Sequence, residues 1–288
     1  MEAVCPSCGW LAETVGGIPV MLSSEDRQNS IFKRYLENYD QIAEQDLADD
    51  ILDPAYVMHQ VDNMVDYVGM LDGDSVCDVG SGQGHLARKL LERGAASVTM
   101  VDIALPYLRT AAKGDDRLLP IMTNAENLPF EDQFDIITST DVMEHVLNLG
   151  SFLFSINRAL KMSGRTFIRV PFRESLLSYS PHLGCPYPFV HMRSFNKDIL
   201  KVYMRSAGFK VERFHYDGFV LGRPQPFWMA NQWRMDRYIQ FQEWAKARNS
   251  DPTDVTRWPS WFARLFMPPC EIVVVARKLA HLDKGTSV

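Results

Sequence analysis

Residues 76–90 read VCDVGSGQGHLARKL. In this stretch an apolar run leads into three glycines at alternate positions, Gly80, Gly82 and Gly84, and then into residues that favour a helix. A strand that turns through glycines into a helix is typical of a βα turn whose backbone closely approaches a nucleotide. The stretch therefore predicts an α/β fold with a nucleotide-type ligand bound at this turn.

Strand-like and helical patterns alternate after this turn. The strand-like runs are 75–79, 97–102, 118–123, 134–140 and 166–170, and helical segments at 85–94 and 149–161 lie between some of them. This alternation predicts a doubly wound, mainly parallel sheet. A helix at 197–207 and two more strands, 209–216 and 271–278, follow. We therefore expect a seven-stranded mixed sheet.

The rest of the chain divides around this sheet. We expect a zinc-knuckle-like leader at 1–24, a helical cap at 25–74 and a main domain at 75–288. An insertion at 222–266 separates the last two strands and holds five of the six tryptophans, with a long helix expected over 227–248. Its aromatic side chains could form a pocket for a sugar or aromatic ring, a homodimer face, or an extra core layer.

Composition excludes several classes of protein. The 288 residues carry a formal net charge of −6 and no long basic run, which disfavours a nucleic acid as the main partner. The apolar run at 272–276 is too short to span a bilayer. The start shows no secretory signal, and five cysteines in a chain of this length do not suggest a disulfide scaffold. We expect a soluble, reduced, cytoplasmic protein.

The glycine loop differs from the two common phosphate-binding loops. A dinucleotide fingerprint needs G-x-G-x-x-G, but the position of its third glycine is His85. A P-loop needs G-K-[ST], which does not follow. Asp78 would repel a pyrophosphate and would suit an ammonium group, whereas Asp102 ends the next strand, where an acid can accept ribose hydroxyls. These acids predict a ligand with a ribose and a cationic group but no phosphate.

At this point the sequence resembles the class I S-adenosylmethionine-dependent methyltransferases. The resemblance covers about half of the chain, roughly residues 75–215. It rests on DVGSGQG (78–84), VTMVDIA (98–104), NAENLPF (124–130), FDIITSTDVMEHV (134–146) and RALKMSGRTFIRVP (158–171). These motifs occur in the order and at the spacing of the family. The resemblance implies a Rossmann-like fold and S-adenosyl-L-methionine as the methyl donor.

The resemblance also implies where the donor binds. It places Gly80, Ser81 and Gly82 under the methionine and ribose, and Asp102 and Ile103 at the ribose and adenine. The adenine edge falls to Asn124, Ala125 and Glu126, and the sulfonium end to Asp141. Tyr39, with Tyr35, resembles the helix that closes over the donor in many relatives, although tyrosines four residues apart are also common in packing. Asn124 departs from the aspartate of many relatives, but an amide oxygen also accepts a hydrogen bond.

Two histidines are candidates for proton removal from an acceptor. His145, in DVMEHV, follows the fourth strand, at the sheet edge where ligands of open α/β folds bind. Its ordinary pKa suits a general base near neutrality. His191 lies in a Pro- and Gly-containing segment, 180–195, after the fifth strand. The alternatives are a wall residue for His145 and a loop histidine bonded to backbone for His191, and Glu144 reads as a helix N-terminal or structural acid.

The CPSCG motif offers Cys5 and Cys8 as metal ligands, but a structural zinc site needs four. It resembles a zinc-ribbon-like leader of some bacterial methyltransferases with its second knuckle missing. We favour a decayed ribbon without metal over zinc shared across a homodimer or completed by distant ligands. Taken together, we expect O-methylation of a small-molecule acceptor, such as a sugar or hydroxylated biosynthetic intermediate. The alternatives are N- or C-methylation, an RNA or protein substrate, and a non-catalytic donor-binding protein.

Overall fold

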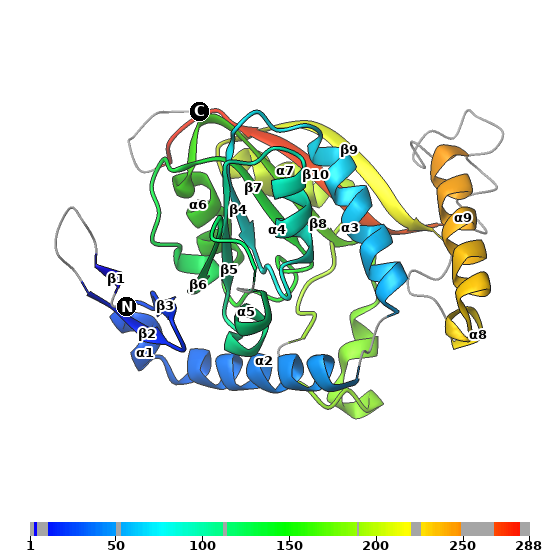
Figure 1. Ribbon diagram of the computed structural model, residues 1–288, viewed down its shortest axis with the longest axis horizontal. Helices are drawn as coiled ribbons and strands as arrows, with labels where there is room; N and C mark the ends of the chain where they lie inside the picture. Colours follow the sequence, from blue (N-terminus) through cyan, green and yellow to red (C-terminus); the bar gives the residue numbers. More distant parts are fainter. Residues whose placement is uncertain are drawn as a thin grey trace.

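The computed structural model shows one mixed sheet with helices on both faces (Figure 1). It describes residues 3–4, 11–49, 53–111, 114–188, 190–219, 226–248 and 268–282. The predicted α/β, Rossmann-like architecture is confirmed. The Cys5 and Cys8 thiols, and with them the predicted zinc knuckle, lie outside the described residues.

Ten strands form the described sheet, in the order β1-β2-β3-β6-β5-β4-β7-β8-β10-β9. Their bounds are β1 Ala3–Val4, β2 Leu11–Val15, β3 Ile18–Val20, β4 Ser75–Val79, β5 Ser97–Asp102, β6 Leu118–Met122, β7 Phe134–Thr140, β8 Leu160–Pro171, β9 Phe209–Phe219 and β10 Pro269–Lys278. The seven strands from β4 onward are those expected from the sequence. The three short strands of the leader extend this sheet beyond β6, because β3 pairs in parallel with β6.

β4 lies at the centre of the sheet. It pairs in parallel with β5 on one side and with β7 on the other, so the chain winds away from it in both directions. Its residues Val76–Val79 are buried, as expected of a strand covered on both faces. The carboxyl end of β4 is therefore a topological switch point, where open α/β sheets bind ligands.

Some helices lie on the two faces of this sheet and others at its edges (Figure 1). They are α1 Ser24–Gln28, α2 Ser30–Asp49, α3 Pro54–Val68, α4 His85–Glu92, α5 Leu105–Ala111, α6 Leu149–Ala159, α7 Lys197–Ser206, α8 Pro226–Met229 and α9 Gln232–Arg248, with 3-10 turns at Ala125–Asn127, Leu176–Tyr179 and Pro181–Leu183. No described helix is both long enough and apolar enough to cross a membrane.

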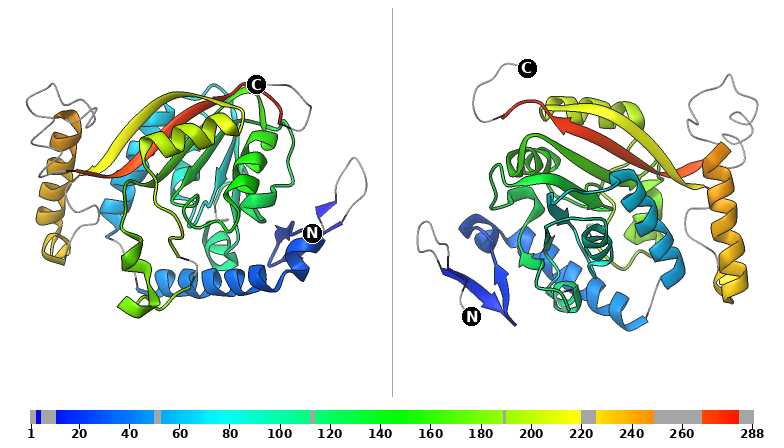
Figure 2. Two further views of the ribbon diagram at one scale, coloured as in Figure 1. Left: turned by 180° about the vertical axis from the view of Figure 1, so that it is seen from behind. Right: turned by 45° about the horizontal axis from the view of Figure 1, so that its top comes forward.

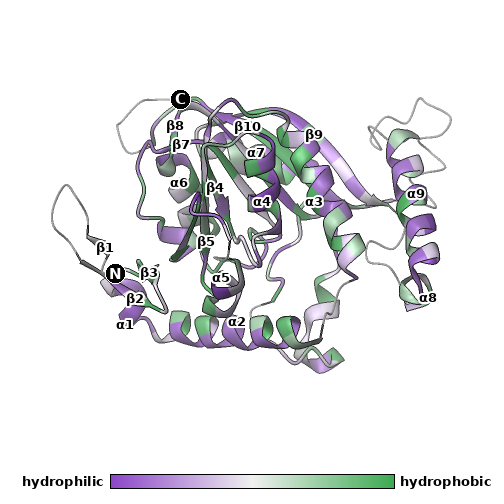
Figure 3. Ribbon diagram, in the orientation of Figure 1, coloured by the Kyte–Doolittle hydropathy of each residue, from purple (hydrophilic) through white to green (hydrophobic). Residues whose placement is uncertain are grey.

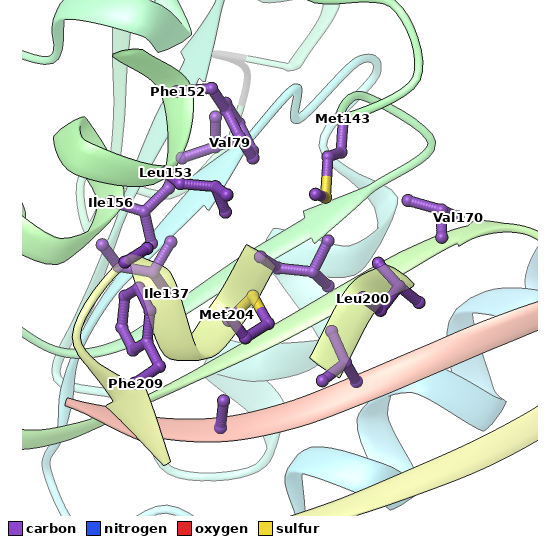
Figure 4. Close-up of a cluster of buried hydrophobic side chains, with 14 of the residues drawn as sticks. Val79, Ile137, Met143, Phe152, Leu153, Ile156, Val170, Leu200, Met204 and Phe209 are labelled. Atoms are coloured by element: carbon purple, nitrogen blue, oxygen red, sulfur yellow. The ribbon is translucent and has the colours of Figure 1, made fainter. Parts of the chain in front are cut away.

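Two hydrophobic cores lie between helices and sheet. On one face, Phe152 and Ile156 of α6 and Met204 of α7 pack against strand residues such as Ile137 (Figure 4). On the other face, side chains of α3, α4 and α5 pack together, among them the fully buried Leu90 of α4. The sheet is thereby held between two helical layers, which fixes the ends of its central strands.

The long helix α2 runs along one edge of the molecule, past α5 (Figures 1 and 2). Hydrophilic and hydrophobic residues alternate along it and along α9, as in helices that pack by one side (Figure 3). Phe32, Tyr35 and Ala43 of α2 are buried. The helix therefore turns its aromatic side inward, toward the edge of the sheet.

The tryptophan-rich insertion lies at the end of the molecule opposite the leader strands β1–β3 (Figure 1). The long helix expected over 227–248 is present as α9, but it begins only at Gln232, after the short helix α8 ends at Met229. The side-chain oxygen of Asn231 accepts from the Arg234 N–H at 3.0 Å at this new start. Met235 and Tyr238 of α9 are buried against Tyr56 of α3. Trp258 and Trp261 lie outside the described residues.

Candidate functional site

A pocket opens between α2 and the carboxyl edge of the sheet. Together with the space that opens to solvent, it spans about 830 Å³. Its lining residues are Tyr35, Tyr39, Ile42, Gly80, Gly82, Val101, Asp102, Ile103, Tyr107, Thr123, Asn124, Ala125, Glu126, Asp141, Val142, His145 and Val146. Ten of the predicted site residues are therefore brought to one cavity.

The glycine loop forms the floor of this pocket after β4. The backbone N–H groups of Gly80 and Ser81 both donate to the carbonyl of Val101, at 2.7 and 3.0 Å. Gly80 has a φ of +74°, and a Cβ atom there would come within 2.1 Å of Val142 Cγ2. Only glycine fits at this position, because both the backbone conformation and the close approach exclude a side chain.

Asp102 connects the second strand to the glycine loop. Its carboxylate accepts from the Gly82 N–H and from the Ala104 N–H, each at 2.9 Å. Burial raises the pKa of this carboxyl, while these backbone N–H groups oppose the shift. A carboxylate has about four lone-pair sites, so Asp102 can accept further hydrogen bonds from a ligand in the pocket.

Asp78 lies in the interior and is not among the residues that line the pocket. Its Oδ1 accepts a 2.7 Å hydrogen bond from the Thr138 hydroxyl. Burial raises the pKa of Asp78 to about 7, with the Thr138 hydrogen bond opposing and Asp102 adding to the shift. The carboxyl thus joins β4 to β7, and the contact with an ammonium group stays a prediction.

The 3-10 turn after β6 supplies one wall of the pocket. Asn124 caps this turn, because its Oδ1 accepts from the Glu126 N–H at 3.0 Å. Its Nδ2 donates to Asp26 of α1 at 2.8 Å. Glu126 in turn accepts from the Leu147 N–H at 2.6 Å. The expected contact between Asn124 and an adenine amino group would therefore use the second lone pair of its Oδ1.

Helix α2 covers the pocket with two tyrosines. The rings of Tyr35 and Tyr39 lie 4.7 Å apart, and the Tyr39 ring meets the His145 imidazole edge-on at 5.8 Å. Burial raises the pKa of both phenols, so they stay neutral and can serve as hydrogen-bond donors. Both residues line the cavity, which is the position that the resemblance implied for Tyr39.

His145 reaches the pocket from the segment after β7. Its Nδ1 lies 3.1 Å from the carbonyl of Val190, so Nδ1 carries the hydrogen and Nε2 is the basic nitrogen. Burial lowers the pKa of His145 to about 4, and the neighbouring His191 adds to this shift. At neutral pH the imidazole is therefore neutral, with an unprotonated Nε2, but it is a weaker base than the ordinary histidine expected from the sequence.

His191 does not line the cavity, but it lies directly behind His145. The two rings meet edge-on, with centroids 4.6 Å apart. The Nδ1 of His191 contacts the Glu174 carboxylate, and the Tyr179 ring stacks on the imidazole at 4.0 Å. Nothing in the local sequence of Glu174 or Tyr179 pointed to this contact, since it depends on how the segment after β8 folds back.

The segment after β8 that carries His191 is held in place by several hydrogen bonds. Met192 N–H donates to the carbonyl of Glu144 at 3.1 Å, and Arg193 donates to the carbonyl of Leu147 at 2.8 Å. Asn38 of α2 donates to the carbonyl of Pro188 at 2.9 Å. By contrast, His182 of the same segment is exposed. Only His191 of the two segment histidines is therefore brought to the site.

Asp141 holds an unusual backbone conformation at the pocket edge. Its φ of +56° lies in the left-handed region, which costs a non-glycine residue roughly 1–2 kcal/mol. Its side chain pairs with the buried Arg169, which also lies 3.6 Å from Glu271. The conformation is held by the Asp141 N–H, which donates to the Arg169 carbonyl at 3.1 Å.

The acidic lining of the pocket limits the kind of ligand that it can bind. Its described lining includes Asp102, Glu126 and Asp141 but neither lysine nor arginine. Such a lining disfavours a phosphate and favours a cation. Apolar walls at Ile103 and Ala125 lie beside Asp102, which suits a ring attached to a ribose. The Ser81 hydroxyl is buried and has no hydrogen-bond partner among the described residues, but Ser81 does not line the cavity, so its contact with the donor stays a prediction. These residues fit an adenosine with a cationic tail.

Comparison with known proteins agrees with this geometry. Residues 32–213 match the family described as a methyltransferase domain, which is more than half of the chain. Over 114 residues, the chain is 32% identical to the ubiquinone biosynthesis O-methyltransferase of Pseudomonas paraeruginosa. This match covers 37% of the chain and 48% of that protein. The chain thus spans about half the length of the curated relatives it matches.

Solved structures share the fold. One is a putative methyltransferase in complex with the Haloferax volcanii Trm112 methyltransferase activator, with a TM-score of 0.59 and 16% identity, covering 86% of this chain and 98% of that chain. Another is phosphoethanolamine N-methyltransferase 2 of Haemonchus contortus with S-adenosyl-L-methionine. Its TM-score is 0.52 and its identity 19%, over 77% of this chain and 52% of that chain. At these identities, the likeness shows the fold alone.

Proposed function

Because this chain belongs to the class I S-adenosylmethionine-dependent methyltransferase family, we propose that it transfers a methyl group from S-adenosyl-L-methionine to a hydroxyl group of a small-molecule acceptor. The observation that carries this proposal is a single cavity lined by Asp102, Tyr39 and His145. An acid for the ribose, an aromatic cover and an unprotonated imidazole meet there.

The donor would occupy the cavity from the glycine loop to the turn after β6. In this pose Asp102 accepts from the ribose hydroxyls, Ile103 and Ala125 contact the adenine, and Asp141 lies toward the sulfonium end. The donor supplies an activated methyl group and leaves as a neutral thioether. The protein's task is then mainly to hold the reacting atoms in line, which can contribute roughly 7–11 kcal/mol.

We assign removal of the acceptor proton to the pair His145 and His191. A hydroxyl is a weak nucleophile until its proton leaves, so it needs a basic group within reach. His145 has its basic Nε2 at neutral pH and lines the cavity. His191 is oriented by Glu174 and Tyr179 and packs against the His145 ring on the side away from the cavity.

The choice of oxygen as the nucleophile has two supports. One is this imidazole pair, because a neutral amine would not need it. The other is the O-methyltransferase name of the curated relatives. A sugar or other hydroxylated biosynthetic intermediate remains our expectation for the acceptor, and a cytoplasmic location our expectation for the protein. The acidic lining disfavours RNA as the alternative acceptor.

Methyl transfer tests the proposal directly. Purified protein with S-adenosyl-L-methionine is incubated with a panel of hydroxylated, amino and carboxylated metabolites, and products are detected by mass spectrometry. We expect a product heavier by one methylene unit, methylated at oxygen, together with S-adenosylhomocysteine. Methylation only at nitrogen or carbon would overturn the choice of acceptor atom. Failure to bind S-adenosylhomocysteine at all would overturn the donor site.

A further inference from the structure

Three side chains beside the donor pocket form a cluster of potential metal ligands. Glu144, His145 and His191 each offer one ligand atom, and these atoms all lie within 4.8 Å of one another. Within this cluster, His145 Nε2 lies 3.7 Å from Glu144 Oε1. Two ligands of a tetrahedral zinc ion with bonds of about 2.0–2.1 Å lie roughly 3.3 Å apart. Small side-chain rotations would therefore bring the three atoms to coordinating distance.

Both imidazoles are oriented as metal-binding histidines are. Such a histidine usually donates its second ring N–H to a carbonyl or a carboxylate, which fixes the tautomer and the ring orientation. The Nδ1 of His145 is hydrogen-bonded to the Val190 carbonyl, and the Nδ1 of His191 contacts the Glu174 carboxylate. The Nε2 of each ring is thus left with a lone pair for a ligand.

Glu144 provides an independent observation. Its side chain is 0% exposed, yet neither carboxylate oxygen has a hydrogen-bond partner among the described residues. A buried, unpartnered carboxylate is costly, and such groups mark sites where a further ligand or ion belongs. A cation between Glu144 and the two imidazoles would compensate this charge. The positive charge of the nearby Arg169 is already shared by Asp141 and Glu271, so a bound cation would supply the compensation.

We propose that Glu144, His145 and His191 hold one divalent transition-metal ion of the zinc type beside the donor pocket. Two imidazoles and one carboxylate form a ligand set used by catalytic zinc sites, which keep a position open for a further oxygen. In this chain the open position would take an oxygen of the acceptor, since His145 lines the cavity.

The use of the ion in catalysis rests on the proposed function. A hydroxyl bound to a divalent cation loses its proton more readily. The proton passes to water, and the oxygen keeps the electron pair with which it forms the bond to the methyl carbon as the carbon–sulfur bond breaks. With its Nε2 bound to the ion, His145 no longer accepts the proton itself. His145 and His191 instead promote proton loss through the ion that they hold.

Zinc counting tests the site without relying on activity. Full-length wild type, Glu144→Gln, His191→Gln and the control His182→Gln are dialysed to equilibrium against zinc, and bound zinc is measured by elemental mass spectrometry. The control removes an exposed histidine of the same segment. We expect Glu144→Gln and His191→Gln to bind one zinc ion fewer per chain than wild type and His182→Gln. Any zinc at the CPSCG motif is common to all four proteins and cancels.

The same four samples are titrated with S-adenosylhomocysteine. Retained binding shows that the variants are folded and that the donor site is intact. Equal zinc content in all four proteins, with donor binding retained, would overturn the metal site and leave the proposed function standing. Loss of one zinc ion in the two variants, with no donor binding in any sample, would support the metal site and overturn the proposed function.

Discussion

The imidazole of His145 meets the imidazole of His191 edge-on, with ring centroids 4.6 Å apart and ring planes at 85°. His145 follows β7 and His191 belongs to the segment after β8, and these strands are parallel neighbours. Their carboxyl ends therefore meet at one edge of the sheet, where α2 covers the pocket. This contact joins a residue that lines the pocket to the segment after β8.

Replacing His145 by alanine should affect turnover far more than donor affinity. General acid–base groups contribute about 10²–10⁴-fold to rates, whereas the donor's ribose and adenine are assigned to other residues. We expect kcat to fall at least a hundredfold, with the dissociation constant for S-adenosylhomocysteine changing little. Steady-state kinetics and calorimetry measure both quantities. The matched control, His182→Ala, should leave kcat unchanged, and near-normal turnover of His145→Ala would reduce His145 to a wall of the pocket.

Replacing Gly80 by alanine should destabilise the glycine loop. The new Cβ would meet Val142 Cγ2 at 2.1 Å, and overpacking of this kind costs about 1–3 kcal/mol. The left-handed backbone adds about 1–2 kcal/mol. Urea unfolding measures the loss of free energy of unfolding.

Two further variants separate these contributions. Gly82→Ala shares the positive φ but meets nothing within 4 Å, so it should lose only the backbone part. Adding Val142→Ala to Gly80→Ala should recover part of the steric cost, as a double-mutant cycle can show. If the two glycine variants were equally stable, the close approach of Gly80 to Val142 would be contradicted.

The buried carboxyl of Asp78 should make stability depend on pH. Its pKa is raised from 3.8 to about 7 in the folded protein, so the folded state holds a proton that the unfolded state releases between these values. The free energy of unfolding therefore falls as pH rises from about 4 to about 7. Asp78→Asn keeps an acceptor for Thr138 without this charge.

The free energy of unfolding of Asp78→Asn, minus that of wild type, should therefore increase across this pH range. The increase should reach up to about 4 kcal/mol, since each pKa unit corresponds to about 1.4 kcal/mol. Urea titrations at several pH values measure it. The control Asp72→Asn alters an exposed carboxylate and should show a nearly constant difference. A constant difference for Asp78→Asn as well would mean that the carboxyl is already charged in the folded protein.

The sequence predicted the parts of the site that follow from strand ends. β4, β5 and β7 begin and end where their apolar runs do, so Asp102, Gly80 and His145 necessarily meet at one edge of a parallel sheet. The placement of these residues needs no knowledge of side-chain packing. Local pattern was therefore sufficient to bring these three residues together, whereas other predicted donor residues, such as Asn124 and Asp141, were implied by the family resemblance.

The remaining features depend on contacts between distant segments. The contact of Glu174 with His191 arises only when the segment after β8 folds back over the sheet edge. The pairing of β3 with β6 joins residues far apart in the chain. Asn124 could be expected at the pocket, but not that its amide already caps the turn and bonds to Asp26. The hydrophobic periodicity of the sequence does not show which distant segments come into contact.

The most direct test of the account is calorimetric titration of S-adenosylhomocysteine into wild type, Asp102→Asn and Asp102→Ala. Hydrogen bonds to a charged group contribute about 1.5–3 kcal/mol each, so we expect tight binding by wild type, weaker binding by Asp102→Asn, and at least a tenfold loss in Asp102→Ala. Thermal unfolding and circular dichroism show whether each variant is folded. If folded Asp102→Ala bound S-adenosylhomocysteine as tightly as wild type, the assignment of this pocket to the methyl donor would be contradicted.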